Sequence, residues 1–181
     1  MQENEKQFIN ELLSPKTQNQ AFKKLIGLYK VQLYHHIRNI VLNHDDTDDV
    51  LQNTFIKVFS NLDSFNQESK LSTWLYRIAT NEALNHLNSK ARKNGLQTDE
   101  ITESAATNLH SDLYFDGDEV QRKLQQAINT LPEKQKLVFN MKYFQDLKYE
   151  EIAQILNTSV GGLKASYHLA VKKIETFFNS D

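Results

Sequence analysis

Residues 149–178, YEEIAQILNTSVGGLKASYHLAVKKIETFF, decide the fold, because two helical patterns stand here on either side of a short polar turn. The turn is Asn157-Thr158-Ser159, and a short helix from Tyr149 to Leu156 precedes it. In the longer helix that follows, apolar residues recur as one continuous stripe of the kind that a helix buries. The stripe consists of Leu163, Tyr167, Ala170, Val171, Ile174, Phe177 and Phe178. A short helix, a tight turn and a longer helix are typical of a helix-turn-helix.

The opposite face of the longer helix is polar and partly cationic. Its residues are Lys164, Ala165, His168 and Lys172. Gly161 and Gly162, near the start of the helix, would let the backbone and the helix dipole approach a phosphate closely. The same pattern also fits an αα-hairpin that closes a helical bundle and leaves a solvated lysine face. From these residues alone, the two interpretations are about equally open.

Two further helices are expected before this pair, which makes a C-terminal four-helix domain over residues 118–181. The first carries Val120, Leu124, Ala127 and Ile128 on one face and ends at Leu131. Pro132 and Glu133 suit the first turn of the second helix, because proline tolerates that position and an acid favours the positive end of the helix dipole. The second helix is expected to bury Leu137, Val138, Met141 and Phe144.

Residues 1–95 predict an N-terminal helical bundle, since amphipathic helices follow one another from about Gln20 to Lys93. Thr47 is expected to cap one helix that runs to Asn61, with Asp48 and Asp49 in its first turn. Another helix opens near Ser72. The fold class is therefore all-α, with two small helical domains.

Residues 96–117 show no sustained period and read as a flexible acidic linker. Residues 96–121 contain no lysine or arginine and seven acidic residues, whereas residues 73–95 and 122–181 each carry a net charge of +3. The formal net charge of −2 therefore conceals two basic blocks with an acidic stretch between them.

The composition excludes several function classes. The chain contains no cysteine, so it has neither a disulfide framework nor a thiolate metal site. The N-terminus lacks the apolar segment of a signal peptide, and no apolar run approaches the roughly 20 residues that cross a bilayer. A cytoplasmic protein without membrane insertion is expected.

The combination of segments resembles the extracytoplasmic-function (ECF) sigma factors of the RNA polymerase sigma-70 family. Glu150-Glu151-Ile152-Ala153, Val160-Gly161-Gly162-Leu163-Lys164 and Ala170-Val171-Lys172-Lys173-Ile174 are similar to the C-terminal promoter-reading domain, region 4. Asp49-Val50-Leu51-Gln52-Asn53-Thr54-Phe55 and residues 72–81, STWLYRIATN, are similar to the N-terminal domain, region 2. The resemblance covers about residues 20–93 and 118–178, with the two domains in the family's order.

The resemblance implies three sets of site residues. Core polymerase, through its β′ clamp, would contact Asp49, Gln52, Asn53 and Lys57. The −10 element would be recognised and melted by Asn66, Gln67, Lys70, Tyr76, Arg77, Asn81, Lys90, Arg92 and Lys93, since a flipped base needs polar groups and aromatic faces. Trp74 is expected in the core rather than at a base. The −35 element would be read by Ser159, Gly161, Gly162, Lys164, Ala165, His168 and Lys172.

The resemblance also implies partners. They are core RNA polymerase, through its β′ clamp and β flap, and promoter DNA. The family is often held inactive by an anti-sigma protein, which makes such a protein a candidate partner that nothing in the sequence identifies. No catalytic residue, cofactor or metal is expected. The acidic linker either threads the polymerase cleft as a nucleic-acid mimic or is a solvated tether that keeps the two domains apart.

Several residues depart from the family's pattern. Leu169 and Val171 stand where the family often carries arginine, and Gly162 replaces a common threonine. Ala165 and Ser166 replace more polar or basic residues, and Asn85 and Asn88 replace an acidic and basic pair. With fewer cations to release counterions, binding to bare DNA is expected to be weak.

Two rival functions remain. An operator-binding dimeric regulator would need a dimerisation or ligand domain, but residues 20–93 show neither a heptad seam nor a glycine-rich ligand loop. A metal hydrolase would have to use His44, Asp45, Asp46, Asp48 and Asp49. These residues read better as the start of a helix, so a sigma factor is the predicted function.

Overall fold

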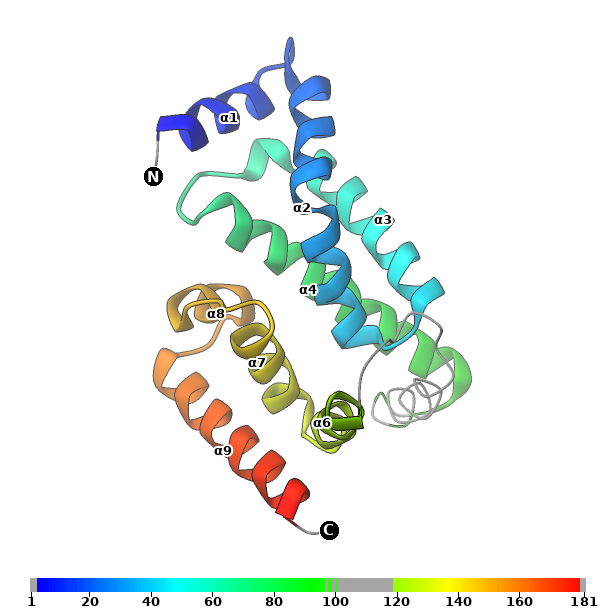
Figure 1. Ribbon diagram of the computed structural model, residues 1–181. Helices are drawn as coiled ribbons and strands as arrows, with labels where there is room; N and C mark the ends of the chain where they lie inside the picture. Colours follow the sequence, from blue (N-terminus) through cyan, green and yellow to red (C-terminus); the bar gives the residue numbers. More distant parts are fainter. Residues whose placement is uncertain (1–2, 97, 99, 101–118, 180–181) are drawn as a thin grey trace.

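The computed structural model describes residues 3–96, 98, 100 and 119–179, and the elements of these residues are helical. The N-terminal half holds α1 (Glu3–Leu13), α2 (Gln18–Val41), α3 (His44–Ser60), the 3-10 turn η1 (Leu62–Ser64) and α4 (Leu71–Asn94). The C-terminal half holds α6 (Glu119–Asn129), α7 (Glu133–Tyr143), α8 (Tyr149–Leu156) and α9 (Val160–Asn179) (Figure 1). The all-α prediction is confirmed.

The N-terminal half is built on three long helices, because α2, α3 and α4 each pack against the other two. Their facing sides supply fully buried side chains such as Leu33, Val58 and Leu75. α1 lies across α2 and η1, with Ile9 and Leu12 buried. The polar composition of the N-terminus gave no expectation of this helix.

The start of α3 corrects the predicted cap. α3 begins at His44, and the side chain of Asn43 accepts a hydrogen bond from the backbone N–H of Asp46 at 2.9 Å. Thr47 is fully buried within α3, and its hydroxyl donates to the carbonyl of Asn43. Thr47 is therefore not the cap, because Asn43 stands one turn earlier and its side-chain oxygen reaches the free N–H group.

The C-terminal half assembles around α9. α6, α7 and α8 all pack on α9. The ring of Phe139 in α7 lies parallel to the ring of Tyr167 in α9, with 5.8 Å between the centroids. Between α8 and α9, Asn157 takes the left-handed conformation that lets the chain turn sharply. The predicted helix pair on either side of residues 157–159 is thus confirmed.

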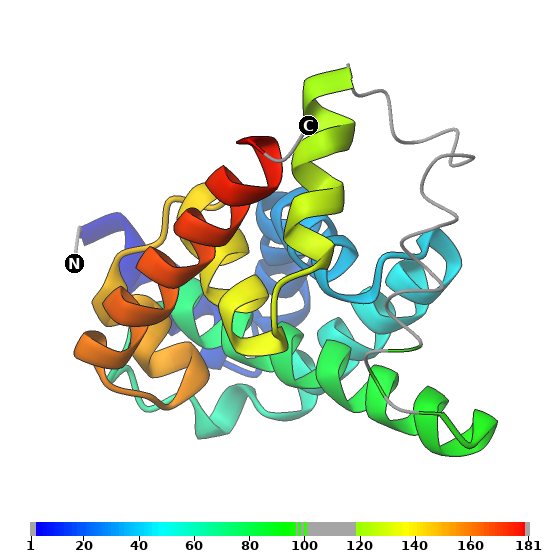
Figure 2. The same ribbon diagram turned by 90° about the horizontal axis from the view of Figure 1, so that it is seen from below.

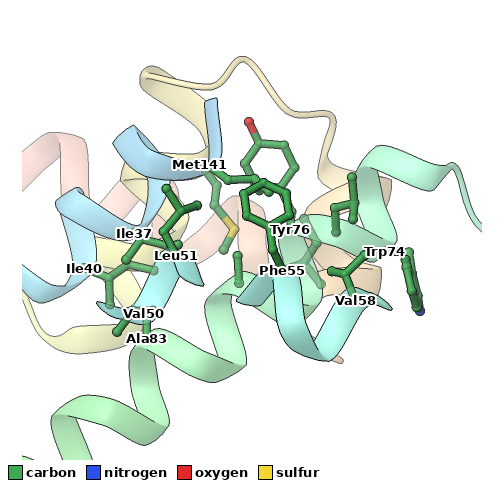
Figure 3. Close-up of a cluster of buried hydrophobic side chains, with 14 of the residues drawn as sticks. Ile37, Ile40, Val50, Leu51, Phe55, Val58, Trp74, Tyr76, Ala83 and Met141 are labelled. Carbon is green, nitrogen blue, oxygen red and sulfur yellow. The ribbon is translucent and has the colours of Figure 1, made fainter. Parts of the chain in front are cut away.

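The two halves pack against each other through α7 and α8. α8 contacts α4, and α7 contacts α2. Met141 of α7 and Ile152 of α8 belong to the same buried apolar cluster as Tyr76 and Ile37 of the N-terminal half (Figure 3). Residues 97, 99 and 101–118 lie outside the described residues, and most of the predicted linker lies there with them.

α7 and α8 form a layer between α9 and the N-terminal helices (Figures 1 and 2). One side of α9 packs on α6, α7 and α8, and its other side faces outward. Among the described residues, no helix combines the length and the apolar character that crossing a membrane demands.

Candidate nucleic-acid interface

The helix-turn-helix of α8 and α9 is closed by a local cap. The backbone N–H of Gly162 donates to the hydroxyl of Ser159 at 3.2 Å, so one free donor at the start of α9 is satisfied. A Cβ atom added at Gly161 would meet nothing within 4 Å, so the backbone there is open to an approaching group. A Cβ atom at Gly162 would lie 3.2 Å from the hydroxyl of Ser159. Of these two glycines, only Gly161 therefore faces open space.

The outer face of α9 carries the predicted residues. Lys164, Ala165, His168 and Lys172 are all exposed. The ammonium group of Lys164 lies 5.8 Å from the centroid of the Tyr149 ring, which holds its side chain beside α8. The face therefore offers cations for phosphate together with small and apolar side chains.

The residues predicted to contact the polymerase clamp share one exposed face of α3. Asp49, Gln52, Asn53 and Lys57 are all exposed, and the ammonium group of Lys57 lies 2.5 Å from a carboxylate oxygen of Glu82 in α4. This face is a ready surface for a partner with complementary polar groups.

Sequence reasoning missed two apolar residues on the exposed side of α3. Ile56 is 57% exposed and Phe59 is 40% exposed. The Phe59 ring also packs edge-on against Phe22, with 4.9 Å between the centroids. Ile56 follows Gln52 by four residues, so helical spacing from the predicted contacts was the signal that could have found it.

Arg77 and Asn81 of the predicted −10 set line a hollow between α3 and α4. The hollow is also lined by Lys57, Asn61, Trp74, Asn85 and Asn88. Its walls also include the carboxylate of Glu82 and the apolar side chains of Ile78 and Leu84. The amide and guanidinium groups among them can donate hydrogen bonds to the edges of bases and to phosphates. Arg77 and Asn81 are both exposed.

The loop before α4 holds the other predicted base contacts. Asn66 and Gln67 are exposed, and Gln67 takes a positive φ of 60°. The ammonium group of Lys70 lies 2.7 Å from the carboxylate of Glu151 in α8. Burial raises the pKa of Glu151, but hydrogen bonds from Lys70 and from the backbone N–H of Lys148 outweigh this effect and lower the pKa overall. The same hydrogen bond raises the pKa of Lys70.

Besides Lys70, two more residues of the predicted −10 set are engaged within the fold. Tyr76 is only 5% exposed and packs edge-on against His36, so in this arrangement its ring is not accessible to a base. Lys90 is half-buried and forms an ion pair with Asp46 at 2.5 Å. Trp74 is 6% exposed against Phe65, which confirms its expected place in the core.

The predicted −10 set does not form one compact surface. Lys70 directly precedes α4, whereas Arg92 and Lys93 are exposed in its last turn. A helix of 24 residues spans about 36 Å, so these cations lie far apart. The structure therefore spreads the predicted contacts along the whole length of α4.

His36 joins the two halves of the molecule. Its ring nitrogens lie 2.8 Å from the hydroxyl of Thr80 in α4 and 3.1 Å from the side-chain amide of Gln145, which follows α7. Burial lowers the pKa of His36 to about 4, although the hydrogen bond with Gln145 acts in the opposite direction. The side chain of Asn140 in α7 donates to the carbonyl of Asn39 at 3.2 Å. Polar contacts thus accompany the apolar packing between the halves.

The acidic residues at the start of α3 are used within the fold. Asp46 pairs with Lys90 and with His86, and His44 contacts Tyr34 and lies 3.7 Å from Asp48. Within the described residues, no three histidine or acidic side chains gather as a metal site would require.

Comparison with known proteins identifies both halves. Residues 25–93 match the family described as "Sigma-70 region 2", and residues 121–174 match the family "Sigma-70, region 4". The first match covers α3 and most of α2 and α4, and the second covers α8 and most of α9. α1 lies outside both matches.

Curated relatives match along most of the chain. The chain is 32% identical to the ECF RNA polymerase sigma factor SigW of Bacillus subtilis over 157 residues, which are 82% of this chain and 83% of the relative. It is 31% identical to the ECF RNA polymerase sigma-E factor of Haemophilus influenzae, with 86% of each chain covered.

Two solved structures share the fold. The sigma factor RpoE of Bartonella quintana, in complex with the anti-sigma factor NepR, superposes with a TM-score of 0.69 at 20% identity, over 88% of this chain and 98% of the other. CnrH, in complex with the cytosolic domain of CnrY, superposes with a TM-score of 0.71 at 19% identity, over 98% of each chain.

Proposed function

The chain belongs to the ECF group of RNA polymerase sigma factors in the sigma-70 family, and from this premise we propose how its surfaces act in transcription initiation. The N-terminal domain, residues 1–95, binds core polymerase and engages the −10 element. The C-terminal domain, residues 118–181, reads the −35 element. Residues 96–117 join them. The polymerase makes the RNA, and this chain directs where it begins.

One observation carries this proposal. The outer face of α9 is turned away from the rest of the molecule and carries Lys164, Ala165, His168 and Lys172, all exposed. A helix that follows a tight turn and bears a cationic outer face fits the major groove of DNA. The open backbone at Gly161 adds the positive end of the helix dipole for a phosphate.

The polymerase contact is assigned to α3. Asp49, Gln52 and Asn53 supply hydrogen-bonding groups, and Ile56 supplies exposed apolar surface on the same helix. A mixed surface of this kind is typical of interfaces with an apolar centre and a polar rim. We therefore add Ile56 and Phe59 to the predicted contacts.

The −10 element is assigned to the loop of Asn66 and Gln67 and to the hollow of Arg77 and Asn81. Melting exposes unpaired bases, and amide and guanidinium groups can bind their edges only after the bases have left the stack. Arg92 and Lys93 are exposed for contacts with the phosphate backbone.

Promoter binding requires the two halves to separate. The names of the −10 and −35 elements give positions about 25 base pairs apart, and at about 3.4 Å per base pair this separation is about 85 Å along a duplex. Lys70, in the predicted −10 loop, lies 2.7 Å from Glu151 in the helix-turn-helix. The two surfaces cannot reach both elements while this contact holds, so the described arrangement is the closed form of the factor.

The interface between the halves suits such a separation. The amide nitrogen of Gln145 and the side-chain oxygen of Asn140 are buried there without hydrogen-bond partners among the described residues. A buried polar group without a partner costs about 1–3 kcal/mol, which weakens the docking. In the Bartonella and CnrH structures, partner proteins accompany sigma factors of this fold. An anti-sigma protein that favours the closed form is a candidate partner of this chain.

The test is run-off transcription with purified core polymerase on a pool of genomic promoter fragments. The wild-type chain should direct transcripts to specific start sites. Lys164→Glu should reduce these transcripts and leave core binding intact, because the new carboxylate repels phosphate. Lys30→Glu, at an exposed position on α2, is the matched control. Unchanged transcription with Lys164→Glu would overturn the assignment of α9.

A further inference from the structure

The outer face of α9 contains four exposed residues at the spacing i, i+3, i+4 and i+7: Ala165, His168, Leu169 and Lys172. Residues at this spacing lie side by side on one helix face. Leu169 is 48% exposed on this face. In the groove, these four side chains would lie nearest to the base edges.

The chemistry of these four residues restricts what they can read. Guanine and adenine are recognised in the major groove chiefly by side chains that make paired hydrogen bonds, namely arginine or lysine for guanine and asparagine or glutamine for adenine. Ala165 and Leu169 have no polar side-chain atoms. The apolar feature that bases present in the major groove is the C5-methyl group of thymine.

We propose that Leu169 reads a thymine methyl group in the −35 element. This inference rests on the proposed role of α9 as the recognition helix. Leu169 would cover a methyl group and exclude water from it, and Ala165, one turn earlier, would leave room for the neighbouring base pair. His168 and Lys172 flank these two residues and contact the polar edges and the backbone.

The charge around Leu169 identifies DNA as its partner. Lys164, Lys172 and Lys173 are exposed on the same helix, and Glu175 is the only acidic residue in α9. Cations that surround an apolar centre suit a partner with phosphates at the rim and methyl groups in the groove. An apolar helix of another protein would not require them.

The same geometry disfavours guanine and cytosine at the contacted positions. Leucine placed over the acceptors of guanine or the amino group of cytosine would remove water from them without supplying a hydrogen bond. The contact with Leu169 therefore favours binding to thymine and disfavours binding to guanine or cytosine. Leu169 thereby becomes a specificity-determining residue rather than a source of general affinity.

The test uses deoxyuridine, which pairs like thymine but lacks the methyl group. A promoter obtained from the genomic pool is synthesised with thymine or with deoxyuridine throughout its −35 element, and transcription by the full chain with core polymerase is compared. The wild-type chain should lose about fourfold in transcription for each methyl group that it contacts. Leu169→Ala should be weaker on the thymine template and nearly insensitive to the substitution.

Val120→Ala is the matched control, since Val120 is 65% exposed in the same domain but lies outside the helix-turn-helix. It should keep the full sensitivity to the methyl groups. Equal wild-type transcription from both templates, or full sensitivity in Leu169→Ala, would overturn the proposal. So would a −35 element without thymine. Promoter-specific transcription that ignores the methyl groups leaves the sigma-factor function standing, whereas loss of all promoter-specific transcription contradicts that function itself.

Discussion

The ammonium group of Lys70 lies 2.7 Å from the carboxylate of Glu151, which joins the loop before α4 to the first helix of the helix-turn-helix. Lys70 is 55% exposed at its side chain, and exposed ion pairs contribute less than about 1 kcal/mol. The contact therefore marks the closed form without locking it. A factor that must open on the polymerase needs a contact of this modest strength.

Lys70→Glu should shift the free protein toward the open form, because it places two carboxylates where an ion pair stood and leaves the Glu151 bond to Lys148 intact. The chain contains no cysteine, so spin labels can be placed at Gln67→Cys and Gln154→Cys. The distance between the labels should be short in the otherwise unchanged chain and become long with core polymerase and promoter.

With Lys70→Glu, a long-distance population should grow by up to about fivefold without any partner. Lys30→Glu, which changes the same charge elsewhere on the surface, should leave the distribution unchanged. A distance that stays short when the labelled chain is bound to polymerase and promoter would show that the halves do not separate.

Ile56→Asp should weaken association with core polymerase more than Asp49→Ala combined with Gln52→Ala. The reason is that a charge in the apolar centre of an interface must be desolvated without a partner. Losses of about tenfold or more in affinity are expected for the aspartate. Co-purification with core enzyme and fluorescence anisotropy measure the effect.

Asp63→Ala, at an exposed position of η1, is the control for this surface and should bind normally. If Ile56→Asp folds and binds core polymerase as the wild type does, the exposed apolar part of α3 has no role in the interface.

Asn43→Ala should lower the free energy of unfolding by about 1 kcal/mol, because it removes the side-chain cap of α3. Urea denaturation followed by circular dichroism measures the change. Asn53→Ala, at an exposed position inside α3, should remain within about 0.5 kcal/mol of the wild type. Equal stability of Asn43→Ala and the wild type would mean that the cap contributes nothing.

The stability of the protein should fall as the pH decreases from 6.5 toward 4. His36 is buried and neutral in the fold, where its pKa is lowered from 6.5 to about 4, while the unfolded chain takes up a proton below pH 6.5. Above pH 6.5, His36 is neutral in both the folded and the unfolded protein, so its burial costs no stability. As the pH falls to 4, the unfolded chain binds a proton that the fold excludes, and about 3 kcal/mol of the free energy of unfolding is lost.

His36→Gln should flatten this part of the pH profile of thermal unfolding, since glutamine keeps polar atoms near Thr80 and Gln145 but does not titrate in this range. His35→Gln, at the exposed neighbouring position, is the control and should retain the slope. An unaltered slope in His36→Gln would assign the acid sensitivity to other groups.

The C-terminal helices could be predicted well from the sequence because their signals are local. Two local signals define α8 and α9 without knowledge of the rest of the fold. One is the helical period of the apolar stripe that includes Leu163, Ala170 and Ile174, and the other is the turn at Asn157. The cap at Asn43 was missed because Thr47 is also a capping residue type. The structure shows that Thr47 lies on the buried side of α3, where it is not available as the cap.

The packing between the two halves could not be predicted, because it depends on long-range contacts that leave no periodic signal. In the fold, His36 forms hydrogen bonds with Thr80 and Gln145. The three residues lie far apart along the chain, and nothing in the sequence indicates that they meet. The burial of Tyr76 has the same origin. A residue's place on a helix face can be read from the sequence, whereas the element that covers that face cannot.

Promoter-directed transcription with purified core polymerase tests the central claim most directly. With the wild-type chain, run-off products should start at defined positions on a genomic fragment pool, and Lys164→Glu should lose most of them while it still co-purifies with the polymerase. Core polymerase that starts at the same positions with and without the chain would contradict the account.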